Sequence, residues 1–296
     1  MNDVNDSINK DLNADLQLFS ILIPSWNNLD ILKITIDSIL KNSFYKHQVI
    51  VHINEGKDGT LEWIKNNKIM HTYSTANVGV CYGFNIPSSL ATCKYIVLSD
   101  DDNYFCPGWD KYLYEEVKKQ DGIKWCLSGT LIEREKTNNS CVISPYNFGA
   151  NKDDFDEKKL LEEFSKLPFN DWQGANWYPM VLPRQLWCAV GGLSVEFSPG
   201  MYSDPDFMKK LWHFGVRTFK GVAKARAYHF MSKTTSRVKK NNGSITFLFK
   251  WRMSSSTFLK YNLNIGQTDT KTDNIPFSKV IKDYFKLIWH SMLFTK

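Results

Sequence analysis

Short apolar segments alternate with helical patterns between residues 18 and 99, and this alternation constrains the fold more than any other feature. The apolar segments span 18–28, 47–54, 69–75 and 94–99. Runs of this length and composition are typical of strands that are buried on both faces. The intervening segments have the apolar spacing expected of helices: 29–43, 59–67 and 78–92. Such an alternation predicts a mainly parallel sheet wrapped by helices.

A polar cluster follows each predicted strand. The clusters are PSWNN at 24–28, NEGKDG at 54–59, NVG at 77–79 and DDDN at 100–103. In open sheets of this kind, ligands bind beyond the carboxyl ends of the strands, so these clusters predict one shared site. Three adjacent carboxylates raise one another's pKa unless a cation offsets the repulsion. The cluster at 100–102 is therefore either a cation site or a solvated turn.

Size and composition indicate an ordinary globular chain. Its 296 residues are enough for one large or two small domains. Residues 1–16 are polar, unlike a secretory signal, and we expect them to form a flexible arm. We expect no membrane-spanning helix, because no apolar run approaches the required length. The six cysteines contain no Cys-x-x-Cys pair, which favours reduced thiols in a cytoplasmic protein.

Charge is distributed unevenly along the chain. Residues 209–296 hold 18 lysines and arginines against 3 aspartates, a net charge of +15, whereas the remainder carries −9. This asymmetry indicates an anionic partner such as nucleotide phosphates or a membrane surface. No nucleic-acid-binding module is recognisable, and the acidic body would repel phosphate, so we do not expect a nucleic acid partner.

The last predicted helix has an apolar face and a basic one. Its apolar side chains are Phe277, Val280, Ile281, Tyr284, Ile288 and Trp289, and its basic ones are Lys279, Lys282, Lys286 and His290. This pattern is typical of a helix lying in a membrane interface. The alternatives are that the helix docks on the catalytic body or pairs in a homodimer.

Seven motifs in one order resemble the family 2 glycosyltransferases. They are SILIPSWNN, VIVHINEGKDGT, NVGVCYGFN, YIVLSDDDN, AVGGLSVEF, SDPDF and YHF, within residues 18–230. The resemblance implies inverting enzymes of the GT-A fold, an α/β architecture with a Rossmann-like, mainly parallel sheet flanked by helices. We therefore expect a catalytic domain at 17–232, with a nucleotide-binding half at 17–105 and an acceptor half at 106–232. A basic, amphipathic, helical extension would follow at 233–296.

The resemblance gives the three aspartates a role. In the family, a D-x-D motif binds Mn²⁺ or Mg²⁺ on the diphosphate of a nucleotide-sugar. The resemblance implies that Asp102 binds the metal directly and that Asp100 contacts the metal or the ribose. It also implies that Asp101 contacts the nucleotide-sugar. In some relatives a histidine at the place of His229 binds the metal or the diphosphate.

The nucleotide-sugar is expected to contact several further loops. Family patterns match Pro24, Ser25, Asn27, Asn77 and Gly79, and Asn54 and Glu55 stand where the family usually has two acidic residues or an Asp-Asn pair. The family aspartate accepts a hydrogen bond from the uracil ring. Asn54 departs from this pattern, but its side-chain carbonyl can still accept, so we continue to expect a UDP-sugar. Lys233 and Arg237 would clamp the diphosphate, or else be solvated surface charges.

A general base and an acceptor site complete the prediction. The family's E-D-x-D motif corresponds to SDPD at 203–206, with Ser203 in place of the first acidic residue, which makes Asp204 the first choice of base and Asp206 the second. The alternative is that these aspartates only cap a helix. Trp172, Trp177 and Tyr178 would stack on acceptor sugars, or else pack in the core.

These features predict a metal-dependent hexosyltransferase of polysaccharide biosynthesis that moves a sugar to a glycan or glycolipid hydroxyl. We expect it in the cytoplasm, peripheral on the inner face of the membrane. A sugar nucleotidyltransferase is disfavoured because PSWNN contains no glycine. The remaining alternative is a non-catalytic GT-A-like protein that binds a glycan or a membrane.

Overall fold

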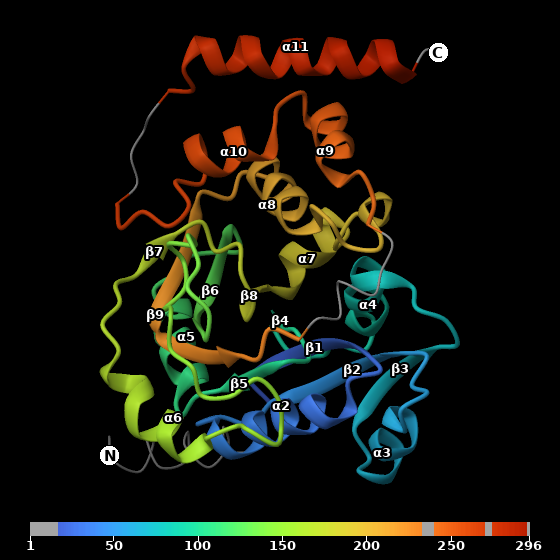
Figure 1. The fold of residues 1–296 in the computed structure, drawn as a ribbon, viewed down its shortest axis with the longest axis vertical. Coiled ribbons are helices and arrows are strands. Elements are labelled where there is room, and N and C mark those ends of the chain that lie inside the picture. Colours follow the sequence, from blue (N-terminus) through green and yellow to red (C-terminus); the bar gives the residue numbers. More distant parts are fainter. Residues whose placement is uncertain (1–16, 233–239, 270–273, 295–296) are drawn as a thin grey trace, which may run out of the picture.

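One mixed sheet runs through the centre of the molecule (Figure 1). The structure is a computed structural model, and it describes residues 17–232, 240–269 and 274–294. Along the sheet the strands are ordered β3-β2-β1-β4-β8-β6-β9-β5, and β7 pairs with β9. The strands are β1 (Phe19–Trp26), β2 (Gln48–Asn54), β3 (Met70–Ser74), β4 (Tyr95–Leu98), β5 (Asn103–Phe105), β6 (Trp125–Glu133), β7 (Trp172–Gln173), β8 (Met180–Pro183) and β9 (Thr218–His229).

The predicted strand–helix alternation is confirmed over the first half of the chain. Strands β1 to β4 are parallel neighbours, whereas β8 runs antiparallel between β4 and β6. The helices are α2 (Leu29–Asn42), α3 (Thr60–Asn66), α4 (Gly79–Ser88), α5 (Trp109–Val117), α6 (Glu157–Glu163), α7 (Arg184–Val190), α8 (Ser203–His213), α9 (Gly243–Trp251), α10 (Ser255–Tyr261) and α11 (Phe277–Phe294). Short 3₁₀ turns lie at Phe164–Lys166 and Val195–Phe197.

Each central strand contributes side chains to two hydrophobic cores, because successive side chains point to opposite faces of the sheet. In β1, Ile21 and Ile23 pack with α2, α3 and α5, whereas Leu22 packs with α4, α7 and α8. The same alternation places Val97 of β4 on one face and its two neighbours on the other. Burial on both faces explains why these strands are apolar throughout, and it holds their carboxyl ends at one edge.

Part of the predicted C-terminal extension belongs to the folded body. Phe247 of α9 and Phe258 of α10 are fully buried in the core that also contains Phe207 and Leu211 of α8. The basic segment is therefore anchored by aromatic side chains, and α11 is the part of it that lies outermost (Figure 1). No helix among the described residues is long and apolar enough to cross a membrane. The predicted arm at 1–16 lies outside the described residues.

Trp172 packs flat against the backbone of the neighbouring strand. It pairs with Gly221 across β7 and β9, and a Cβ added to Gly221 would lie 1.9 Å from the nearest indole atom. We expect Gly221→Ala to lower the free energy of unfolding by about 1–3 kcal/mol, because overpacking forces the ring or the strand to move. Urea unfolding followed by fluorescence measures the change. An unchanged midpoint would contradict this packing.

Candidate functional site

The polar clusters after β1 to β4 converge on one cavity, as predicted. This cavity has a volume of about 140 Å³. It is lined by Pro24, Ser25, Trp26, Asn54, Asn77, Gly79, Val80, Asp100, Asp101 and Pro199. We call it the nucleotide cavity. Most of the predicted nucleotide-contacting residues that the structure describes are therefore brought together here.

Asp101 ties the end of β4 to the loop after β1. Its carboxylate accepts hydrogen bonds from Ser25 Oγ at 2.6 Å and Asn28 Nδ2 at 3.1 Å. Its backbone carbonyl accepts from Thr35 Oγ1 at 2.8 Å. Burial, followed by the charge of Asp102, raises the pKa of Asp101 to about 7. These contacts give Asp101 the role of holding the loops around the cavity in place.

Asp100, Asp102 and His229 form a cluster suited to a cation. One ligand atom from each of the three side chains lies within 4.8 Å of the others. Pairing of Asn103 in β5 with His229 in β9 brings the histidine beside the aspartates. His229 Nε2 lies 3.5 Å from Asp102 Oδ1. Two carboxylates and one imidazole are a donor set that Mn²⁺ accepts, and carboxylates alone suit Mg²⁺.

Two further groups hold this cluster in place. Glu133 Oε1 lies 3.3 Å from His229 Nδ1, on the side of the ring that faces away from Asp102. The backbone N–H of Ser232 donates to Asp102 Oδ2 at 2.7 Å. Glu133 was not predicted from the sequence. A carboxylate behind a metal-binding histidine fixes the ring and its tautomer, so this arrangement matches the usual outer shell of a metal site.

The pKa values also indicate a site built for a positive charge. Burial, followed by the charge of Asp102, raises the pKa of Asp100 to about 8. Burial by itself would raise the pKa of Asp102, but His229 and the Ser232 N–H together lower it. Burial by itself would lower the pKa of His229, but Asp102 and Glu133 raise it to about 10. Without a metal, protons on Asp100 and His229 offset the clustered carboxylates, and a divalent cation would replace them.

A second cavity of about 240 Å³ adjoins the first. We call it the acceptor cavity, and its lining comprises Val80, Asp100, Leu131, Asn176, Trp177, Tyr178, Pro199, Gly200, Met201, Ser203, Asp204, His229 and Lys240. It shares Val80, Asp100 and Pro199 with the nucleotide cavity. Asp100 therefore stands at the junction of the two spaces.

Asp204 faces the acceptor cavity from the first turn of α8. Its Oδ1 accepts a hydrogen bond of 2.7 Å from the Tyr178 hydroxyl. Burial raises the pKa of Asp204 above the ordinary carboxyl value, although Tyr178 and Ser203 partly oppose the shift. An oriented carboxylate with a raised pKa is a suitable general base near neutral pH.

Gly79 allows the start of α4 to pack closely against the backbone of Pro199, which lines both cavities. Its φ is +79°, and a Cβ there would lie 2.7 Å from the Cα of Pro199. Val80 N donates to the Pro199 carbonyl at 2.8 Å, so the start of α4 is fixed against the loop before α8. Asn77 Oδ1 caps this turn by accepting from Gly79 N at 2.9 Å. Asn77 and Gly79 thus shape the site through the backbone.

Asn27 and Glu55 lie beside the nucleotide cavity and do not line it. Asn27 Nδ2 donates to Glu55 Oε2 at 3.1 Å, and both residues have positive φ. Hydrogen bonds from Trp26 and then Asn27 lower the pKa of Glu55. The pair connects the loops after β1 and β2, and it stores backbone strain of a kind that is concentrated near functional sites.

Two predicted site residues lie in the protein interior. Asp206 is fully buried, and its Oδ1 accepts from Trp251 Nε1 at 2.8 Å and lies 2.9 Å from Lys250 Nζ. Trp172 is 2 % exposed and donates to Thr130 Oγ1 at 3.0 Å. Neither lines the acceptor cavity, because helix geometry turns Asp206 away from Asp204 and β7 stacks Trp172 on β9. Lys233 and Arg237 lie outside the described residues.

Asn176 lines the acceptor cavity and was missed by the sequence reasoning. It is 7 % exposed, and its Oδ1 has no hydrogen-bond partner among the described residues. Buried polar atoms are nearly always paired, so this unpaired amide oxygen marks a place where a water or a ligand group could donate a hydrogen bond. Its neighbours Trp177 and Tyr178 line the same cavity, as predicted.

A pH-dependent stability follows from the cluster. Between about pH 6.5 and 8, the folded protein holds protons on Asp100, Asp101 and His229 that the unfolded chain has lost. We therefore expect the free energy of unfolding without metal to fall as pH rises, by at most about 1.4 kcal/mol per pH unit for each proton. The lowered pKa of His52, about 4, acts below this window.

Urea unfolding at both ends of this window measures the effect. Saturating Mn²⁺ should shrink the pH difference, because the cation displaces the same protons. Stability that rises with pH in the metal-free protein would contradict the charge balance of the cluster.

Comparison with known proteins identifies the family. Residues 20–162 match the model of glycosyl transferase family 2. This segment of the chain is a family 2 glycosyltransferase domain. The matched residues include the three aspartates, Glu133 and every residue that lines the nucleotide cavity except Pro199, whereas Asp204 and His229 lie outside the match. A search of curated protein sequences gave no significant match.

Solved structures of the same architecture support the assignment to the GT-A fold. A crystal structure of residues 1–349 of S. aureus TarS has 14 % identity and a TM-score of 0.51, covering 72 % of this chain and 60 % of that one. A longer S. aureus TarS structure has 12 % identity and a TM-score of 0.54, covering 92 % and 44 %. The 1–349 form in complex with UDP has 14 % identity and a TM-score of 0.54, covering 92 % and 71 %.

At these low sequence identities, the structural similarity shows a common fold and no more. The chain spans 60 % and 44 % of the length of the first two structures, so TarS has substantial regions without a counterpart here. The predicted fold class, an α/β fold with a mixed sheet flanked by helices, is confirmed. Of the eight strand pairings among the described residues, four are parallel and four are antiparallel, so the sheet is less parallel than predicted.

Proposed function

We propose that this protein is an inverting glycosyltransferase that uses a nucleotide-sugar donor and a divalent cation. The observation that carries the proposal is the junction of the two cavities at Asp100, where Asp100 and His229 of the candidate metal cluster line the same cavity as Asp204. A transferase needs a cation site and a base close together, because donor and acceptor must meet at one point. A protein that only binds glycans needs neither a cation cluster nor a base.

The proposed donor site lies mostly in the nucleotide half, 17–105, and His229 joins it from the acceptor half. Asp102 and His229 would hold Mn²⁺ or Mg²⁺, with Asp100 as a third ligand or a ribose contact. When bound, such a cation supplies positive charge to the leaving diphosphate. The chain itself orients the ligands, because Ser232 and Glu133 fix Asp102 and His229 from behind.

The proposed chemistry is one displacement with inversion. Asp204 accepts the proton of the acceptor hydroxyl while that oxygen forms a bond to the anomeric carbon. The bond between this carbon and the diphosphate oxygen breaks on the opposite face, and its electron pair leaves with the nucleotide. Tyr178 holds the Asp204 carboxylate in position through the 2.7 Å hydrogen bond.

A UDP-sugar is the proposed donor. The comparison structure in complex with UDP supports it, as does the family pattern around Pro24, Ser25 and Asn27. Asn54 Oδ1 already accepts from Val78 N at 3.0 Å. To bind uracil as well, the second lone pair of Asn54 Oδ1 would have to accept a hydrogen bond from the uracil ring.

The proposed acceptor is the hydroxyl of a glycan or lipid-linked glycan in the acceptor half, 106–232. Trp177 and Tyr178 offer aromatic faces, and Asn176 offers an unpaired amide oxygen. Hexosyl transfer in polysaccharide biosynthesis remains the proposed role. A cytoplasmic location is supported by the absence of disulfides among the described residues, where all six cysteines are free.

Donor hydrolysis tests the proposal directly. Purified protein is incubated with UDP-, GDP-, CMP- and TDP-sugars, with and without Mn²⁺, and release of nucleotide is measured. We expect slow, metal-dependent release from one nucleotide class, because water can replace the acceptor in the acceptor cavity. A non-catalytic glycan-binding relative would release nothing from any donor.

The role of Glu133 gives a prediction that does not depend on turnover. We expect Glu133→Gln to weaken Mn²⁺ binding by about 10- to 100-fold, because it loosens the His229 ring and its tautomer. Electron paramagnetic resonance of free Mn²⁺ measures the affinity. Glu135→Gln, an exposed neighbour on the same segment, is the matched control. Equal Mn²⁺ affinities in the two variants would show that Glu133 does not support the metal site.

A further inference from the structure

Helix α11 attaches to the protein by its polar side. Asp283 is 4 % exposed, and its Oδ2 accepts from Ser254 N at 2.8 Å and Ser254 Oγ at 3.1 Å. Ser254 is also the N-cap of α10, so these contacts fasten α11 to the body. A surface helix normally buries its apolar face against the core, whereas most large apolar side chains of α11 are exposed.

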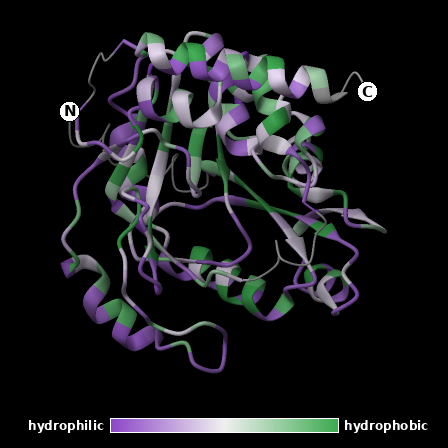
Figure 2. Ribbon diagram, turned by 45° about the horizontal axis from the view of Figure 1, so that its top comes forward, coloured by the Kyte–Doolittle hydropathy of each residue, from purple (hydrophilic) through white to green (hydrophobic). Residues whose placement is uncertain are grey.

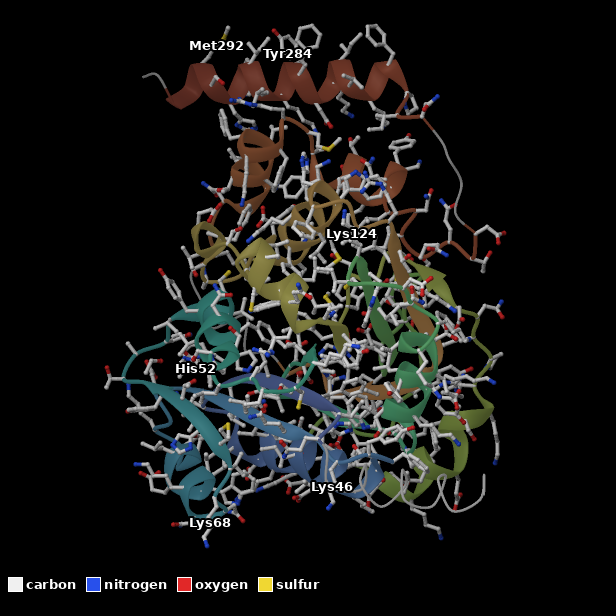
Figure 3. The ribbon with its side chains drawn as sticks, turned by 180° about the vertical axis from the view of Figure 1, so that it is seen from behind. Lys46, His52, Lys68, Lys124, Tyr284 and Met292 are labelled. Atoms are coloured by element: carbon white, nitrogen blue, oxygen red, sulfur yellow. The ribbon has the colours of Figure 1, made fainter. Side chains whose placement is uncertain are left out.

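The apolar face of α11 consequently points away from the protein. Four large side chains at four-residue spacing form an outer row: Phe277, Ile281, Phe285 and Trp289, exposed by 77 %, 38 %, 65 % and 65 %. Figure 3 shows Tyr284 on the outward side of the same helix, and Figure 2 shows hydrophobic and hydrophilic bands along it. Contiguous exposed apolar patches on soluble proteins mark sites of interaction.

Positive charge runs beside the outer row. Lys282 and Lys286 follow Ile281 and Phe285 by one residue each, and together with Trp289 they line one shallow surface depression. The single acidic residue between 277 and 292 is Asp283, which is buried and hydrogen-bonded. The outer row, flanked by lysines and with no exposed carboxylate beside it, is complementary to the surface of an anionic lipid layer.

We propose that α11 docks the protein on an anionic membrane surface, with the outer row in the acyl–headgroup boundary and Lys282 and Lys286 at the phosphates. A second copy of the chain fits this face less well, because pairing two such helices brings their lysines together. Figure 1 places α11 at the end of the molecule opposite α2 and α3. Docking therefore leaves the loops after β1–β4 free, and it does not depend on the transferase chemistry.

Vesicle flotation of the full chain tests the proposal. The probes are vesicles of phosphatidylcholine alone and of phosphatidylcholine with phosphatidylglycerol in equal amounts. We expect binding to the anionic vesicles only, weakened about fivefold for each of Lys282→Gln and Lys286→Gln. The pair Phe285→Ser with Trp289→Ser should lose binding by more than about tenfold. Leu40→Ser, which removes an apolar side chain that is 71 % exposed on α2, should bind like the wild type.

Two results would overturn this assignment. One is the absence of binding to either vesicle by a wild-type protein that still gains thermal stability from nucleotide and Mn²⁺. The other is a lipid-free dimer that the Phe285→Ser, Trp289→Ser variant dissociates, which would assign the face to a second copy. Nucleotide-induced stabilisation in each variant confirms that it is folded.

Discussion

Asp204→Asn should lower kcat by about 10²- to 10⁴-fold while leaving donor binding intact. The amide keeps the shape of the carboxylate, and its oxygen can still accept from the Tyr178 hydroxyl, but it cannot take the proton of the acceptor. Steady-state kinetics with the donor identified by hydrolysis measure kcat and KM separately. Donor KM and metal-dependent nucleotide binding should stay within a few-fold of the wild type.

The pH profile separates a base from a structural residue. Because burial raises the pKa of Asp204, wild-type kcat/KM should decline as pH falls through a value above the ordinary carboxyl range, where the base becomes protonated. Asp204→Asn should lose this acidic limb. Asp206→Asn is the comparison, since it disturbs the contacts with Lys250 and Trp251 and should mainly reduce stability. A larger loss of kcat in Asp206→Asn than in Asp204→Asn would reverse the assignment.

Asp102→Asn should abolish metal-dependent nucleotide binding and lower kcat/KM by about 10³-fold or more. The substitution removes the charge that faces His229 Nε2 and replaces the ligand carboxylate by a neutral amide. Calorimetric titration of Mn²⁺, and of nucleotide in its presence, measures both effects. Asp121→Asn, an exposed aspartate in a surface loop, controls for net charge. Full metal-dependent binding by Asp102→Asn would exclude the cluster as the metal site.

The sequence predicted most of the parallel half of the fold because its signals are local. Four apolar runs with intervening amphipathic stripes correspond to β1–β4 and α2–α4. The insertion of β8 between β4 and β6 was not predictable in this way. It depends on pairing Tyr95 with Pro183 across a long stretch of chain, and no short-range pattern encodes that contact.

The site residues likewise divide into those that local sequence patterns mark and those that only long-range strand pairing brings in. Asp100, Asp102 and Asp204 follow strand ends or begin helices, where sequence patterns mark them. Glu133 reaches His229 only because β6 and β9 pair in a register that places the two residues opposite each other. One missed distinction was visible in the sequence: residues two apart on a helix face opposite sides, so Asp204 and Asp206 could not both line one cavity.

The most direct test of the account is nucleotide binding measured by thermal shift. UDP, GDP, CMP and TDP are each added with and without Mn²⁺ to the wild type and to Asp102→Asn. A ligand that binds the folded state raises the Tm by mass action. The account predicts that one nucleotide, UDP, stabilises the wild type only when Mn²⁺ is present and does not stabilise the variant. Failure of every nucleotide to raise the Tm in either condition would contradict the account and leave the three aspartates without a role in nucleotide binding.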